Sequence, residues 1–149
     1  MDAHTALQAM NRRLGAALAR VLLGVDDERI FFSAPVIDAR PIAEVAIHAY
    51  SSLLGFTSAV AGERWPSDPQ PPASAAELLA TIDAMRERTN EMIASLAEGV
   101  LETEVTLPWG QRIGALDAIA DGLAHGFGHV GAIAGIRAIG GFPTPPESY

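Results

Sequence analysis

Three breaks rich in proline or glycine divide this sequence into four long segments in which apolar residues recur at helical spacing. The spacing predicts helices from about Ala3 to Leu23, from about Asp38 to Gly62, from Ser74 to about Gly99 and from about Leu116 to Ile139. A chain of 149 residues is long enough to bury one well-formed core. We therefore expect a single, mostly helical domain over residues 1–149.

Local signals refine the ends of these segments. Asp38 is expected to cap the second helix, with Pro41 in its first turn. Ser74 and Glu77 have the spacing of a capping box and predict the start of the third helix. Residues 101–107 alternate apolar and polar side chains before a Pro-Trp-Gly turn, which predicts a short strand or hairpin between the third and fourth helices.

The composition excludes several classes of function. Ten basic against 18 acidic residues give a net charge of -8, which disfavours nucleic acid and anionic membranes as partners. The chain contains no cysteine, so it has no disulfide, no thiolate ligand and no cysteine nucleophile. Any bound metal must therefore be held by nitrogen and oxygen atoms.

One segment, Ile113 to Ile139, is long and apolar enough to resemble a membrane-spanning helix. It contains Asp117, Asp121, Arg137 and two histidines. An ionisable group at mid-bilayer depth costs about 2.5–3.5 kcal/mol, which argues against a spanning helix. The N-terminus also lacks the pattern of a secretion signal, so we expect the protein in the cytoplasm.

A histidine pair in the fourth predicted helix is the main chemical signal. His125 and His129 are one turn apart, so their side chains leave the same face of the helix, about 6 Å apart at Cβ. His48 in the second predicted helix is the candidate third ligand. Three neutral imidazoles bind zinc or nickel and leave a coordination position open. Glu44 and Asp121 each lie one turn before a histidine. Each carboxylate is expected either to orient that imidazole or to bind the metal directly. The alternative is that each is an ordinary surface carboxylate.

The fourth predicted helix is apolar on two sides, so the histidines are not simply its solvated stripe. A second apolar side predicts a homodimer, with Leu123, Phe127 and Val130 as interface candidates. Glycines in a helix cost about 0.8–1 kcal/mol each relative to alanine, so close packing or a ligand is expected to compensate. The five glycines inside this helix are Gly122, Gly126, Gly128, Gly131 and Gly135.

Several motifs together resemble one family over essentially the whole chain, the DinB/YfiT-like metalloenzymes. The motifs are a histidine in the second helix, Leu107-Pro-Trp-Gly110, His125-x-x-x-His129-x-Gly-x-Ile and Arg137-x-x-Gly-Gly141. The resemblance implies a four-helix bundle of the up-down-down-up type with a divalent metal on His48, His125 and His129. It also implies chemistry with a low-molecular-weight bacterial thiol such as bacillithiol or mycothiol, because family members include thiol-dependent S-transferases and isomerases.

The chain departs from the family after its last histidine, where relatives often carry Arg and then Gly-Gln but this sequence has Val130-Gly131-Ala132. The leading hypothesis is a metal-dependent transferase that joins a low-molecular-weight thiol to an electrophilic small molecule. A metal-dependent hydrolase, with Glu44 or Asp121 as base, is one alternative. A bundle that binds a metal or small ligand without catalysis is the other.

Overall fold

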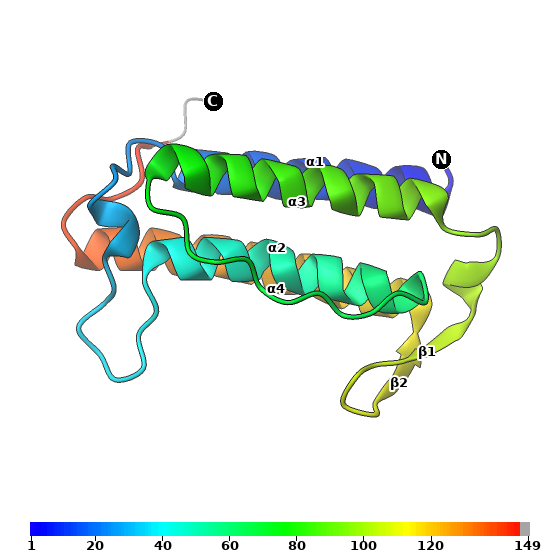
Figure 1. Ribbon diagram of the computed structural model, residues 1–149. Coiled ribbons are helices and arrows are strands. Elements are labelled where there is room, and N and C mark those ends of the chain that lie inside the picture. The colour runs from blue at the N-terminus through cyan, green and yellow to red at the C-terminus, as the bar shows by residue number, and fades with distance from the viewer. Residues whose placement is uncertain (147–149) are drawn as a thin grey trace.

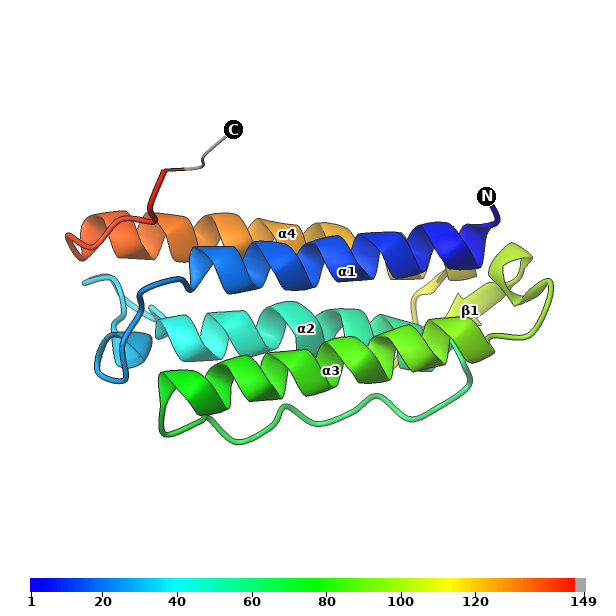
Figure 2. The same cartoon turned by 90° about the horizontal axis from the view of Figure 1, so that it is seen from above.

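The computed structural model describes residues 1–146, and within them the chain forms four long helices in two layers. Helices α1 (Ala3–Val21) and α3 (Ala75–Ser95) form one layer, and α2 (Ile42–Val60) and α4 (Ala115–Ile139) form the other (Figure 1). Seen from above, α1 and α4 run in one direction and α2 and α3 in the opposite one (Figure 2). The predicted bundle of up-down-down-up type is thus confirmed.

The connections differ in length and in structure. A long segment after α2 returns along that helix to the start of α3 (Figure 1). The predicted hairpin between α3 and α4 is confirmed, although its strands are shorter than the alternating pattern suggests, because a 3-10 turn takes the first residues of that pattern. The short elements in the described chain are the 3-10 turns Arg29–Phe31 and Val100–Glu102 and the antiparallel strands β1 (Glu104–Thr106) and β2 (Arg112–Gly114).

The predicted helix starts are right for α3 and wrong for α2. The Ser74 hydroxyl accepts a hydrogen bond from the Glu77 amide at 3.1 Å, as a capping box requires. Asp38 does not cap α2, because it lies in the preceding loop with a φ of 59°. Pro41 is the cap residue instead, and the helix begins at Ile42.

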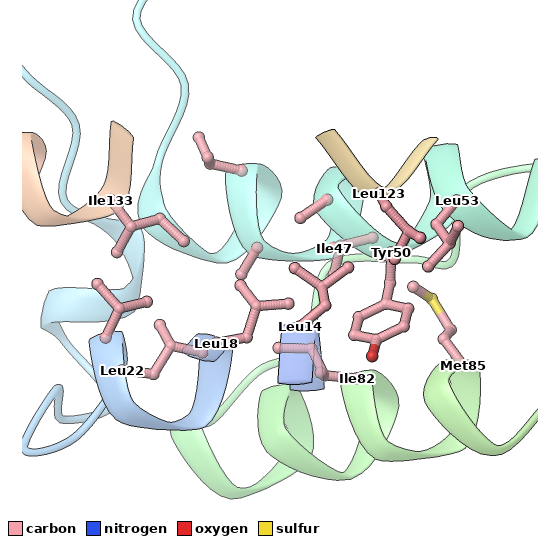
Figure 3. Close-up of a cluster of buried hydrophobic side chains, with 14 of the residues drawn as sticks. Leu14, Leu18, Leu22, Ile47, Tyr50, Leu53, Ile82, Met85, Leu123 and Ile133 are labelled. Atoms are coloured by element: carbon pink, nitrogen blue, oxygen red, sulfur yellow. The ribbon is translucent and has the colours of Figure 1, made fainter. Parts of the chain in front are cut away.

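The core lies between the two layers and receives side chains from all four helices (Figure 3). Tyr50 is fully buried there, and its hydroxyl donates to the Asn11 carbonyl oxygen at 2.8 Å, which links α2 to α1. The labelled core residues are Leu14, Leu18, Leu22, Ile47, Tyr50, Leu53, Ile82, Met85, Leu123 and Ile133.

The side of α4 that carries Ile119 and Leu123 is covered within the chain, because α4 packs against both α1 and α2, whereas Ala132 on the other apolar side is exposed. Leu123 is only 6% exposed and belongs to the core, so its assignment to a dimer interface is wrong. Phe127 and Val130 are half-buried against the same core. Within residues 1–146, no helix has the length and hydropathy needed to cross a membrane.

Two glycines allow α4 to approach α2 closely. A Cβ atom at Gly122 would lie 3.0 Å from the Leu53 Cα, and one at Gly126 would lie 3.2 Å from the Ala49 carbonyl oxygen. Such distances leave no room for a side chain without movement of the backbone. Close packing therefore offsets the helix-propensity cost of these two glycines, as expected. A Cβ atom at Gly131, in contrast, would have no neighbour within 4 Å.

This difference predicts opposite effects of the same substitution on one helix. Gly122→Ala should lower the free energy of unfolding by about 1–3 kcal/mol, because the new methyl group must push α2 and α4 apart. Gly131→Ala should raise it by about 0.5–1 kcal/mol, because alanine is the better helix former. Urea denaturation of both variants measures the two effects. A gain in stability for both would mean that α2 and α4 do not touch at Gly122.

The end of α4 is fixed by a buried arginine. Arg137 is only 3% exposed, and its guanidinium donates to the carbonyl oxygens of Val21 at 2.6 Å, Leu23 at 2.8 Å and Phe142 at 2.9 Å. The guanidinium carbon also lies 5.7 Å from the centre of the Phe142 ring. Arg137 thus ties the end of α1 and the chain after α4 to one point, which gives this motif residue a structural role.

Candidate metal centre

Three of the four histidines meet where α2 packs on α4. His48 comes from α2, and His125 and His129 come from α4. One nitrogen atom from each ring lies within 4.8 Å of the other two, and the Nε2 atoms of His125 and His129 are 2.9 Å apart. The structure therefore brings together all three residues that the sequence singles out as ligands.

The local sequence explains this convergence. His125 and His129 share a face of α4 because they are one turn apart. His48 precedes Ala49, whose carbonyl oxygen is the close neighbour of Gly126, so the tight approach of the two helices places its ring beside the pair. The ring centre of His48 lies 5.2 Å from that of His125 and 5.1 Å from that of His129.

The environment of His125 and His129 favours their neutral forms. Partial burial, followed by the nearby charges of His125, His48 and Arg40, lowers the pKa of His129 to about 4. The pKa of His125 is also lowered, first by burial and then by His48. Because a metal ion binds the unprotonated ring, the lowered pKa values of His125 and His129 favour metal binding at neutral pH. Three converging imidazole nitrogens fit a divalent ion such as zinc and leave a fourth position for a small molecule.

The lowered pKa of His129 predicts how acid affects the metal-free protein. The pKa is about 4 in the folded chain against 6.5 for an ordinary imidazole, so between these values the unfolded chain binds more protons. Stability is therefore greatest above about pH 6.5 and falls as the pH falls towards 4. His129→Gln should flatten this dependence in thermal melts with a chelator present. An unchanged slope would show that His129 is not desolvated.

In the described residues, neither Glu44 nor Asp121 forms an ion pair with a histidine of the cluster, but the carboxylate of Asp68 lies beside one. The Glu44 carboxylate pairs with Arg40 at 3.5 Å, and Asp121 is exposed and makes no ion pair with a histidine in residues 1–146. Asp68 instead places Oδ2 3.9 Å from His48 Nδ1. Sequence reasoning missed it because it lies in the loop after α2; the signal is that it is the only acid in the proline-rich run 65–72.

We expect Asp68 to orient His48 when a metal binds. A carboxylate beside the second nitrogen of a ligating histidine fixes the ring, and its loss weakens metal binding by about 10–100-fold. The Ser52 hydroxyl, 3.4 Å from His48 Nε2, flanks the other nitrogen. Asp68→Asn should therefore lower zinc affinity in this range, while Glu44→Gln should leave it unchanged. If a competition titration gave the same zinc affinity for both variants, Asp68 would have no role in the metal site.

Two further features flank the histidine cluster. An open cavity of about 300 Å³ includes His129 in its wall. On the other side, two turns after His48, Phe56 packs edge-on against Trp65 and Trp109, with ring centres 5.2 and 6.0 Å away. The cluster thus lies between an apolar cavity and an aromatic group formed by two loops and α2.

The fold and the cluster together define a four-helix bundle with three histidines at the contact of α2 and α4. The sequence matches the family model of the DinB superfamily over residues 6–133, so the chain belongs to the DinB superfamily, as the motifs predict. No curated protein matches the sequence.

Solved structures share the fold. The crystal structure of a mycothiol-dependent maleylpyruvate isomerase aligns with a TM-score of 0.58 and 17% identity, over 89% of this chain and 61% of that one. A histidine-to-alanine mutant of that isomerase aligns with a TM-score of 0.58 and 16% identity, over the same shares. This chain therefore spans less than two thirds of the length of these relatives, and at such identity the likeness shows the fold alone.

Proposed function

We propose that this protein is a metal-dependent enzyme that transfers a low-molecular-weight thiol to an electrophilic small molecule. His48, His125 and His129 would hold one divalent ion, zinc or nickel. The convergence of three imidazoles, with one nitrogen of each within 4.8 Å of the others, is the observation that carries the proposal. Membership of the DinB superfamily and a fold shared with a mycothiol-dependent isomerase support the choice of a thiol.

The chain has no cysteine, so the reacting sulfur must come from the cosubstrate. A bound divalent ion with an open position lowers the pKa of a thiol and so favours its nucleophilic form. In the transfer, the sulfur forms a bond to the electrophilic carbon, the leaving group departs with its bonding electron pair, and the thiol proton passes to solvent. The protein orients the reactants, with Asp68 beside Nδ1 of His48 orienting that ring so that its Nε2 would be the atom that binds the ion.

The cell compartment and the assembly are also proposed. Low-molecular-weight thiols are kept reduced in the cytoplasm, so we propose a cytoplasmic location. A homodimer remains a prediction, and any interface must lie outside Leu123, which is in the core. Light scattering at micromolar concentration tests the assembly: a dimer mass supports it, and a monomer mass contradicts it.

The proposed reaction predicts a thiol-dependent and metal-dependent rate. Zinc- or nickel-loaded protein should accelerate the reaction of mycothiol with N-benzyl-2-chloroacetamide, measured as chloride release, above the rate with metal-free protein. His125→Ala should return the rate to background. Hydrolysis of simple esters without a thiol would replace the proposal with the hydrolase alternative. No metal-dependent rate with a panel of thiols, electrophiles and esters would favour a non-catalytic binder.

A further inference from the structure

The cavity beside His129 is walled mainly by apolar side chains from three parts of the chain. It lies between the loop before α2 and the second half of α4. We call it the apolar pocket. Its lining residues are Ala34, Val36, Asp38, Ala39, Arg40, Val45, His129, Ala132 and Ile136.

The apolar pocket begins at the histidine cluster. Ala132 and Ile136 follow His129 by one and two turns, so they continue the same face of α4. Val45 on α2 is one turn before His48. A molecule in the apolar pocket would therefore contact a histidine of the cluster at one end and apolar walls along the rest of its length.

The loop that forms the outer wall has a fixed base. The Ile42 amide donates to the Phe32 carbonyl oxygen at 3.0 Å, which closes the loop where it meets α2. Val36 lines the apolar pocket and is 67% exposed, so a bound apolar group would remove its side chain from water. The two charged lining residues, Asp38 and Arg40, have opposite signs, so the walls carry no net charge that would select an ion.

We propose that the apolar pocket binds the uncharged, apolar body of the electrophile and so presents its reactive carbon to the histidine cluster. This inference rests on the proposed function. A cavity of about 150 Å³ is enough for benzene, so a pocket of about 300 Å³ takes one ring with a short substituent. The polar thiol then approaches His48 from the side of Ser52 and Asp68.

A substitution that fills the apolar pocket tests the inference. For metal-loaded Ala132→Phe, the KM for N-benzyl-2-chloroacetamide should rise at least 10-fold, while the KM for N-methyl-2-chloroacetamide, the KM for mycothiol and the zinc affinity stay close to wild type. Ala120→Phe, at an exposed position on α4 outside the apolar pocket, is the matched control and should change none of these values. Val36→Ser, in an exposed loop, should raise the KM for the benzyl compound severalfold without affecting the helices.

A binding measurement separates this inference from the proposed function. Unreactive N-benzylacetamide should shift the backbone NMR signals of Val45 and Ile136 in wild type but not in Ala132→Phe. Binding without thiol transfer would uphold the apolar pocket and refute the proposed reaction. Transfer with equal KM changes for the benzyl and methyl compounds, or benzyl shifts that persist in Ala132→Phe, would overturn the inference.

Discussion

Replacing His129 by alanine should lower the affinity for zinc by at least about 100-fold, more than the loss of a residue that only orients a ligand. The substitution removes one of three converging nitrogens and leaves two imidazoles on the cluster. His48→Ala should have an effect of the same size, because it removes the single ligand from α2. Competition with a chromophoric chelator at neutral pH measures both affinities.

His4 provides the control for this experiment. Its Nε2 atom lies 3.2 Å from the Leu96 carbonyl oxygen, near the start of α1, and it takes no part in the cluster. His4→Ala should bind zinc as wild type does. Wild-type affinity in both His129→Ala and His48→Ala would contradict the three-histidine site.

Replacing Arg137 by alanine should lower the free energy of unfolding by about 3–5 kcal/mol. The substitution leaves the carbonyl oxygens of Val21, Leu23 and Phe142 without their donor, at a position that is 3% exposed in the wild type. Domains of this size are stable by about 5–15 kcal/mol, so the variant should unfold at a much lower urea concentration.

An exposed arginine is the matched control. Arg88 pairs with Glu63 at 3.0 Å, and about half of each side chain is exposed. Arg88→Ala should therefore cost less than about 1 kcal/mol. If urea denaturation gives the same small loss for both variants, Arg137 does not tie α1 to the end of α4.

The features that the sequence predicts well depend on local spacing. Helical periodicity locates all four helices of the described chain, and the one-turn interval brings His125 and His129 to the same face of α4. His48 is found because its residue type and its place in an apolar helix are visible without the fold. Sequence spacing alone is sufficient for these inferences.

The features that cannot be predicted from the sequence depend on contacts between distant segments of the chain. Asp68 reaches His48 only because the loop after α2 returns along that helix. Asp38 has the residue type of a cap, but the loop places it at a φ of 59° before the helix begins. The sequence predicts an interface role for Leu123 because an isolated helix with two apolar sides needs a partner, but in the bundle Leu123 packs into the core.

The most direct test of the metal site is a titration of the metal-free protein with zinc, followed through the ring NMR signals of its four histidines. The signals of His48, His125 and His129 should change together and reach their final positions at one equivalent of zinc, while those of His4 stay where they are. A titration in which these three rings do not respond together, or in which no end point occurs at one equivalent, would contradict a single ion held by the three histidines.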